Sequence, residues 1–169
     1  MAGLEEFREQ LVELLPRLRR FARTITRDPA DADDLVQLSL ERALLRWRQW
    51  QPGSRLDSWM FGIIKNAWID EIRARRRRDR LFVDEEAGTH VGERSAELQV
   101  ETMAIRQAMA RLPEEQRMAV ALVLVEGLSY KDAAASLEVP IGTLTSRLAR
   151  ARAALMAELS ENQGKETRP

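Results

Sequence analysis

Residues 127–152 read GLSYKDAAASLEVPIGTLTSRLARAR, which is the pattern of a short helix, a tight turn and a second helix. Ser129 can cap the first helix, and Asp132 follows three residues later, as in a capping box. Val139-Pro140 ends that helix, because proline has no amide donor and restricts the residue before it. Two helices joined in this way predict a helix-turn-helix, for which DNA is the first ligand to consider.

The second of these helices has two different faces. Its apolar residues recur at helical spacing and predict a buried stripe of Leu144, Leu148, Ala151, Leu155 and Leu159. The opposite face contains Ser146, Ala149 and Arg150, with Thr145 and Arg152 on one flank and Arg147 on the other. Because arginine binds guanine edges bidentately and small residues allow close approach to the major groove, we expect a recognition helix. The alternative is a plain amphipathic hairpin whose arginines form a solvated face.

The composition argues against an enzyme. At 169 residues, 44% of them hydrophobic, the chain can form one ordinary domain or two small ones. It has no cysteine, which excludes a disulfide framework and cysteine-ligated zinc. Its one histidine, His90, lies in a linker-like stretch rich in Gly, Glu and Thr. We therefore expect no enzymatic activity, no cofactor, no metal site and no small-molecule ligand.

Charge is distributed unevenly along this formally neutral chain. Residues 1–82 carry 17 basic and 13 acidic side chains, whereas residues 83–101 carry one and six. No apolar run is long enough to span a bilayer, and the N-terminus has neither the basic start nor the apolar core of an export signal. We expect a cytoplasmic protein with no membrane span.

Helical patterns fill the first half of the chain. The first predicted helix ends before Asp28-Pro29 and is interrupted only by Pro16; its apolar stripe comprises Leu11, Leu14, Leu15, Leu18, Phe21, Ala22 and Ile25. Carboxylates at residues 31–34 favour the start of a second helix, at about residues 30–50. A third helical stretch covers residues 56–78, with a candidate bend near Lys65-Asn66.

An acidic segment separates these helices from the rest. Residues 79–101 contain two glycines, six acids beyond residue 82 and little periodicity, which predicts a flexible linker. Helices are expected again over residues 102–112 and 114–126, ended by Pro113 and Gly127.

The predicted fold is all-α, because no strand-like alternation occurs in the sequence. It consists of two small helical domains, residues 1–78 and 102–159, joined by the flexible acidic linker, and the second domain contains the helix-turn-helix. Residues 160–169 are polar and are predicted to form a disordered tail.

A second constellation lies in residues 58–78, which read SWMFGIIKNAWIDEIRARRRR. Aromatic rings stack on unpaired bases and arginines follow phosphates, so the segment predicts a nucleic-acid surface. The alternative for Trp59, Phe61 and Trp68 is a place in the core, which we favour for each ring taken singly. The consecutive arginines Arg75–Arg78 repel one another, and either phosphates or the negative end of the helix dipole would relieve that repulsion.

Three motifs together resemble the extracytoplasmic-function (ECF) sigma factors of bacterial RNA polymerase. They are DDLVQ at residues 33–37, WMFGIIKNAWID at residues 59–70 and the helix-turn-helix at residues 127–152. Many regulators contain a helix-turn-helix, so one motif alone is weak. All three occur in the family's order and spacing, over about residues 5–158.

The resemblance implies a subunit of transcription initiation with no active site of its own. Its first domain would bind the β′ clamp of core RNA polymerase and melt the minus-ten element of promoter DNA, and its second domain would read the minus-thirty-five element. The acidic linker would pass through the polymerase toward the RNA exit path. The β subunit of core polymerase is a further implied partner. An anti-sigma factor is a further expected partner, and the general-stress branch is the nearest branch of the family.

The family also implies roles for particular residues in the first domain. Asp34, Gln37 and Glu41 correspond to clamp-binding residues. Asn66, in a loop before Trp68, corresponds to part of a pocket for a flipped base, which fits because a base is read on its pairing edge only outside the stack. The minus-ten DNA would be held by Lys65 and Trp68 and, within the cationic run 73–78, by Arg73, Arg76 and Arg77.

In the second domain, the resemblance implies contacts to the upstream element from Thr145, Ser146, Arg147 and Arg150. The sequence departs from the family at three positions. Leu38 stands where an acid usually follows Gln37, which bears on clamp affinity. Glu138 replaces a common turn glycine and costs backbone energy if its φ is positive. Thr145 replaces a frequent basic residue, which bears on upstream specificity.

Two other classes of protein remain as alternatives. A sigma-like module could bind an anti-sigma protein without reading promoters, but it would need neither an arginine-bearing outward helix nor Arg75–Arg78. A stand-alone helix-turn-helix regulator would bind duplex DNA alone, but it would not need the Trp/Asn/Arg segment of residues 59–78.

Overall fold

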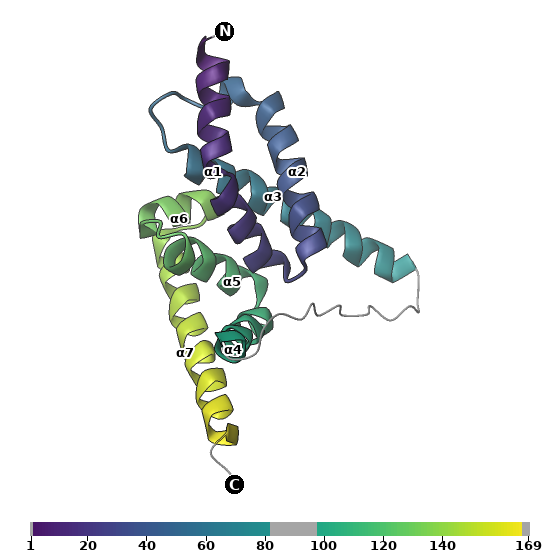
Figure 1. Ribbon diagram of the computed structural model, residues 1–169, viewed down its shortest axis with the longest axis vertical. Helices are drawn as coiled ribbons and strands as arrows, with labels where there is room; N and C mark the ends of the chain where they lie inside the picture. The colour runs from purple at the N-terminus through teal and green to yellow at the C-terminus, as the bar shows by residue number, and fades with distance from the viewer. Residues whose placement is uncertain (1, 82–97, 167–169) are drawn as a thin grey trace. The chain divides into compact units, whose positions relative to one another are not determined.

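The computed structural model describes residues 2–81 and 98–166, and all the regular secondary structure in these ranges is helical (Figure 1). The chain divides into two compact units, Met1–His90 and Val91–Pro169. The predicted all-α fold with two helical domains is confirmed. Most of the predicted linker, residues 82–97, lies outside the described residues, so the domain bounds stay predictions.

The first unit contains three long helices that share one core. They are α1 (Ala2–Thr26), α2 (Pro29–Leu45) and α3 (Leu56–Leu81), with a short 3-10 turn, η1 (Trp47–Gln49), after α2. Figure 1 shows α1 and α2 side by side in opposite directions, with α3 crossing both. The core includes Phe7, Leu18, Phe21, Ile25, Leu35, Val36, Met60, Phe61 and Ile64. Each helix therefore depends on the other two for burial of its apolar face.

Pro16 does not interrupt α1, although the sequence indicated a break there. A proline inside a helix removes one backbone hydrogen bond and costs about 3 kcal/mol. Buried side chains on both sides of it, Leu11 and Leu18, hold the two halves of the helix against the same core and offset that cost. At the next helix start, the Asp28 carboxylate accepts a hydrogen bond from the Asp31 amide at 2.9 Å and caps α2.

The start of α3 is fixed to α1 by Asp57. Its carboxylate lies 3.0 Å from Arg17 of α1 and 2.8 Å from Arg55, and it accepts a hydrogen bond from the Ser58 amide. Burial by itself raises the pKa of the Asp57 carboxyl, but these hydrogen bonds outweigh it and the net pKa lies below the ordinary value. The charged form of Asp57 is therefore the one that holds the helix.

From this anchor α3 continues without a break to Leu81. The expected bend and loop near Asn66 are therefore wrong, because residues 58–78 contain no proline and their buried stripe continues through Phe61, Ile64 and Trp68. The phase of a continuous helix decides which of its side chains face the core.

The second unit contains the helix-turn-helix. Its elements are α4 (Leu98–Arg111), α5 (Glu114–Val120), a π-helical turn η2 (Ala121–Val125), α6 (Tyr130–Leu137) and α7 (Ile141–Glu166). The predicted tail is shorter than expected, since α7 includes residues 160–166 and only 167–169 lie outside the described residues. Glu and Gln in this segment are good helix formers, and polarity alone does not end a helix.

The predicted details of the turn are present. The Ser129 hydroxyl accepts a hydrogen bond from the Asp132 amide at 3.0 Å, which caps α6. Glu138 has φ +55° and ψ +43°, so the expected left-handed conformation and its cost of about 1 kcal/mol are both present. Of the predicted stripe on α7, Leu144, Leu148 and Ala151 are buried, and Leu155 and Leu159 are half-buried.

Gly127 gives a test of the backbone strain before α6. Its φ is +70° and a Cβ there would meet no atom within 4 Å, so Gly127→Ala should destabilise the second unit by about 1 kcal/mol through backbone strain alone. Gly142→Ala is the control, because a Cβ there is equally uncrowded and its φ is not positive. Amide hydrogen exchange in α6 and α7 should accelerate only for Gly127→Ala, and equal effects would contradict the assignment.

Candidate nucleic-acid and protein interfaces

The outward face of α7 is exposed as predicted. Thr145, Ser146, Ala149 and Arg150 all lie at the surface. The Thr145 hydroxyl donates to the Ile141 carbonyl at 2.9 Å, and the Ser146 hydroxyl donates to the Gly142 carbonyl at 3.0 Å. Both hydroxyls are therefore held against their own helix, which leaves a low surface beside Arg150 that suits close approach to a base-pair edge.

Arg147 differs from the other predicted contacts of α7. Its side chain is only 18% exposed, and its Nη2 lies 3.2 Å from Glu115 Oε2 of α5. It therefore positions α7 against α5 and would have to leave this ion pair to bind DNA. Arg150 is in no ion pair within the described part of the second unit, so no such exchange is needed.

The arginine run of α3 divides into paired and unpaired members. The two terminal nitrogens of Arg75 lie 2.9 and 2.7 Å from the Asp31 carboxylate of α2, and its Nε lies 2.8 Å from Glu71. The guanidinium also lies 5.5 Å from the ring centroid of Trp68. The hydrogen bonds that Arg75 donates to Asp31, and then those to Glu71, raise the pKa of Arg75. Arg75 therefore ties α3 to the start of α2.

The predicted DNA contacts Arg73, Arg76 and Arg77 are exposed, and none forms an ion pair within residues 2–81. Asn66 is also exposed, and the spacing of 7 and 4 residues puts Asn66, Arg73 and Arg77 on one face of α3. Asp70 lies on the same face, where Arg42 of α2 neutralises it at 3.2 Å. An amide and two guanidinium groups without an ion pair among residues 2–81 therefore lie along one face of α3.

Lys65 and Trp68 are placed differently from the expectation. They are 4% and 5% exposed, because their spacing from Phe61 and Ile64 puts them on the core face of α3. The core interpretation of Phe61 and Trp68 is correct, whereas Trp59 is half-buried. In this conformation neither Lys65 nor Trp68 presents its side chain to a DNA surface.

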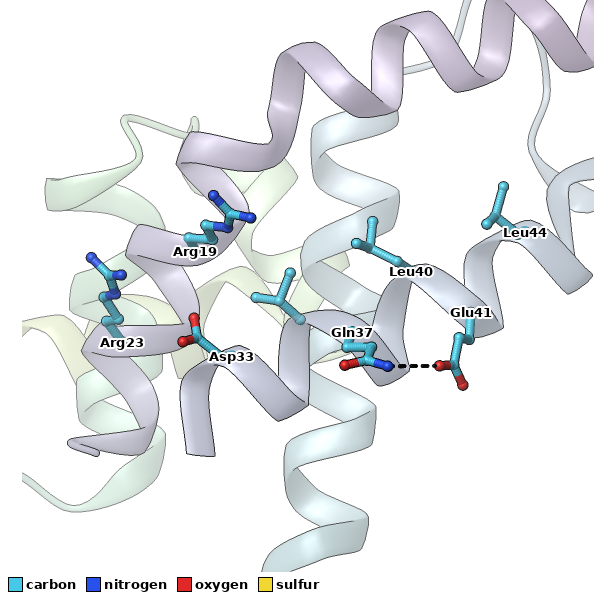
Figure 2. Close-up of a pocket in the computed structure, with 8 residues that line it drawn as sticks. Arg19, Arg23, Asp33, Gln37, Leu40, Glu41 and Leu44 are labelled. Atoms are coloured by element: carbon cyan, nitrogen blue, oxygen red, sulfur yellow. Dashed lines mark hydrogen bonds between the residues drawn. The ribbon is translucent and has the colours of Figure 1, made fainter. Parts of the chain in front are cut away.

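The predicted clamp-binding residues Asp34, Gln37 and Glu41 are exposed on α2. Gln37 donates a long hydrogen bond to Glu41, with 3.4 Å between Nε2 and Oε1 (Figure 2). Gln37 and Glu41, but not Asp34, line an open groove of about 550 Å³ between α1 and α2; its other lining residues are Arg19, Arg23, Asp33, Val36, Leu40 and Leu44. Sequence reasoning missed Arg19 and Arg23, although their spacing of four residues puts them on one helix face.

The described residues contain no group of three or more His, Asp or Glu side chains arranged to hold a metal ion. Across the same residues, no helix is long and apolar enough to cross a membrane.

Comparison with known proteins identifies the family. The family models Sigma-70 region 2 and Sigma-70, region 4 match residues 11–78 and 102–155. The ECF RNA polymerase sigma factor EcfG of Rhodopseudomonas palustris is 37% identical over 155 residues, which cover 92% of this chain and 86% of that protein. The ECF RNA polymerase sigma factor SigM of Mycobacterium tuberculosis is 39% identical over 140 residues, which cover 82% and 69%.

Two solved structures are similar to this chain along most of its length. The sigma factor RpoE of Bartonella quintana, in a co-crystal with the anti-sigma factor NepR, has a TM-score of 0.77 and 34% identity, with 92% of this chain and 98% of that chain covered. CnrH, solved with the cytosolic domain of CnrY, has a TM-score of 0.68 at 24% identity over 92% and 88% of the two chains, which shows the shared fold alone. The chain belongs to the ECF family of RNA polymerase sigma factors, as its motifs predicted.

Arg75 gives a test of how α3 is held. Arg75→Ala removes ion pairs to two carboxylates and should destabilise the first unit by about 1 kcal/mol. Arg76→Ala, which removes an arginine without an ion pair in residues 2–81, should change stability by less than about 0.5 kcal/mol. Urea denaturation followed by tryptophan fluorescence isolates this unit, because all four tryptophans precede residue 69. High salt should reduce the difference in stability between the Arg75→Ala and Arg76→Ala variants, because it screens ion pairs. Equal losses of stability in the two variants would contradict the role of Arg75.

Proposed function

We propose that this sigma factor directs core RNA polymerase to one promoter class through two separate DNA surfaces. The observation that carries the proposal is that each unit exposes arginines without an internal ion pair among the described residues: Arg73, Arg76 and Arg77 on α3, and Arg150 on α7. Binding of such arginines to phosphates or base edges is favourable, because no internal ion pair has to be broken first. A protein that only mimics a sigma factor would need neither surface, and a stand-alone duplex reader would not need the one on α3.

In the first unit, α3 acts on the minus-ten element. The amide of Asn66 can donate and accept hydrogen bonds at the pairing edge of a base that has left the stack. Arg73 and Arg77, on the same helix face, bind the neighbouring phosphates, and Arg76 adds to the local positive potential. Lys65 and Trp68 support this face from the core side, which replaces the direct contact first expected of them.

In the second unit, α7 reads the minus-thirty-five element in the major groove. Arg150 makes the base contact, with Thr145 and Ser146 close to the DNA backbone. Arg147 contributes after release from Glu115 or acts by holding α7 in place. Thr145 brings no positive charge, so upstream affinity depends more on Arg150 than it would with a basic residue at that position.

The exposed residues of α2 and the known relatives support two further partners. Asp34, Gln37 and Glu41 bind the polymerase clamp, with Leu38 as an apolar neighbour in place of an acid. RpoE of Bartonella quintana binds the anti-sigma factor NepR, which supports an anti-sigma partner for this chain as well. We infer that the protein is not an enzyme and that it acts in the cytoplasm, together with RNA polymerase.

Transcription with purified core polymerase tests the proposal directly. The full chain should direct core polymerase to a small set of sequences in a promoter library, while the chain alone binds those promoters poorly. A complete lack of stimulated transcript from the library would overturn it. Tight binding of the chain alone to duplex promoters would favour the stand-alone regulator instead.

Asn66→Ala should reduce promoter opening more than upstream binding, because the amide contacts only an unstacked base. Permanganate reactivity of melted thymines and protection of the upstream element, measured on the same holoenzyme, separate the two effects. Gln49→Ala, which removes an exposed amide of η1 in the same unit, should change neither. Equal losses of opening and upstream binding for Asn66→Ala would count against the pocket.

Arg150→Ala should cost about 1–3 kcal/mol at one upstream base pair and relax the preference at that position. Holoenzyme binding to promoters with single substitutions in the upstream element measures this. Arg106→Ala removes an exposed arginine of α4 in the same unit and should leave the preference unchanged. A uniform loss over all sequences would make Arg150 a phosphate contact.

A further inference from the structure

Asp70 is an acid in the middle of the α3 face to which DNA binding is assigned. It lies four residues after Asn66 and three before Arg73, so the three side chains share one face of the helix. The Asp70 side chain is 58% exposed. A carboxylate in this place repels the phosphates that the neighbouring arginines attract. A contact that a carboxylate makes with the DNA would offset this electrostatic cost.

Arg42 of α2 holds only one oxygen of this carboxylate. Arg42 Nη1 lies 3.2 Å from Asp70 Oδ2, and Asp70 Oδ1 forms no hydrogen bond within residues 2–81. The Arg75–Asp31 pair differs, because there two guanidinium nitrogens bind both carboxylate oxygens, at 2.9 and 2.7 Å. That bidentate geometry suits a structural cross-link, whereas the Asp70 pair leaves an acceptor oxygen open on the DNA face.

An amide and an open carboxylate one turn apart can recognise a particular kind of base edge. Residues four apart on a helix have Cβ atoms about 5–6 Å from each other, so Asn66 and Asp70 can both reach one base. The carboxylate only accepts hydrogen bonds, whereas the amide donates and accepts them. Adenine, cytosine and guanine each carry an exocyclic amino donor, and thymine presents carbonyl oxygens instead. A carboxylate at this place therefore favours a base that has an amino group.

We propose that Asp70 accepts a hydrogen bond from the exocyclic amino group of an unstacked base in the minus-ten element, and that Arg42 positions its carboxylate. Asp70 is then a specificity-determining residue that rejects thymine. Arg42 is a positioning residue, because it fixes Oδ2 and offsets the negative charge that phosphates would otherwise meet. The inference rests on the proposed function, since it requires α3 to bind melted promoter DNA.

Promoters with a pre-melted minus-ten element test the base contact. Each base with an amino group is replaced, one at a time, by an analogue without it: adenine by purine, cytosine by 2-pyrimidinone and guanine by hypoxanthine. Holoenzyme binding, measured by fluorescence anisotropy of the labelled promoter, should fall about tenfold at one position for the wild-type chain. In the Asp70→Ala holoenzyme the same replacement should change binding by less than about twofold.

Asp79→Ala is the matched control, because Asp79 is an exposed acid of α3 nine residues further on, on the opposite side of the helix. It removes the same charge and should leave the preference for the amino group intact. Asp70→Asn keeps an acceptor oxygen without the charge and should retain part of the preference. A cooperative urea transition of tryptophan fluorescence verifies that each variant is folded. Equal losses of preference in Asp70→Ala and Asp79→Ala would overturn the base contact.

Arg42 has a separate test. Arg42→Gln should weaken binding to the pre-melted promoter by about fivefold at low salt, because the uncompensated Asp70 carboxylate repels phosphates, and less at high salt. Added to Asp70→Ala, the same change should have an effect within about twofold. Arg46→Gln removes an exposed arginine one turn further along the chain and should also stay within about twofold. A loss for Arg42→Gln that persists without the Asp70 carboxylate would overturn the positioning role.

The outcomes also separate this inference from the proposed function. If Asn66→Ala reduces promoter opening but no amino-group replacement weakens wild-type binding, Asp70 reads no base and the inference falls alone. If a replacement weakens wild-type and Asp70→Ala binding equally, another residue reads that amino group, and again only the inference falls. If neither Asn66→Ala nor Asp70→Ala affects opening or binding, the minus-ten surface proposed on α3 falls with it.

Discussion

The two attachments of α3 determine what the first unit can present to a ligand. Asp57 holds the start of the helix to Arg17 of α1, and Arg75 holds its later part to Asp31 of α2. Between these points an unbroken helix has only one rotational setting that buries Phe61, Ile64 and Trp68. That setting turns Asn66, Arg73 and Arg77 outward, so the surface assigned to promoter DNA results from how the opposite face packs.

Arginine has different tasks at different places in this protein. Arg117 lies in the core of the second unit, where it donates to the Leu112 carbonyl at 2.8 Å and satisfies a backbone group at the end of α4. Arg75 is a structural cross-link, whereas Arg150 has no ion pair among the described residues. Net charge and arginine counts do not distinguish these roles, because each role depends on which groups the fold places beside the guanidinium, such as the Asp31 carboxylate 44 residues away from Arg75.

Local sequence patterns predicted much of the fold and part of the sites. The cap at Ser129, the left-handed Glu138 and the exposure of Arg150 each depend on a few neighbouring residues, and all three are present. The burial of Lys65 differs from the expectation, because a loop near Asn66 would release Lys65 from the core face, whereas the continuous helix places it there. The pairing of Arg75 with Asp31 spans 44 residues, and the groove that Arg19 and Glu41 line lies between two helices, α1 and α2. Neither can be derived from one helix at a time.

Glu138 also bears on how such a factor searches a genome. The turn keeps a glutamate in the left-handed conformation just before the helix that carries Arg150, where a glycine would relieve the backbone strain. A negative charge near that helix opposes the attraction to phosphate that every DNA sequence offers equally. Because a genome presents an enormous excess of such competing sites, a weaker general attraction leaves more of the factor unbound.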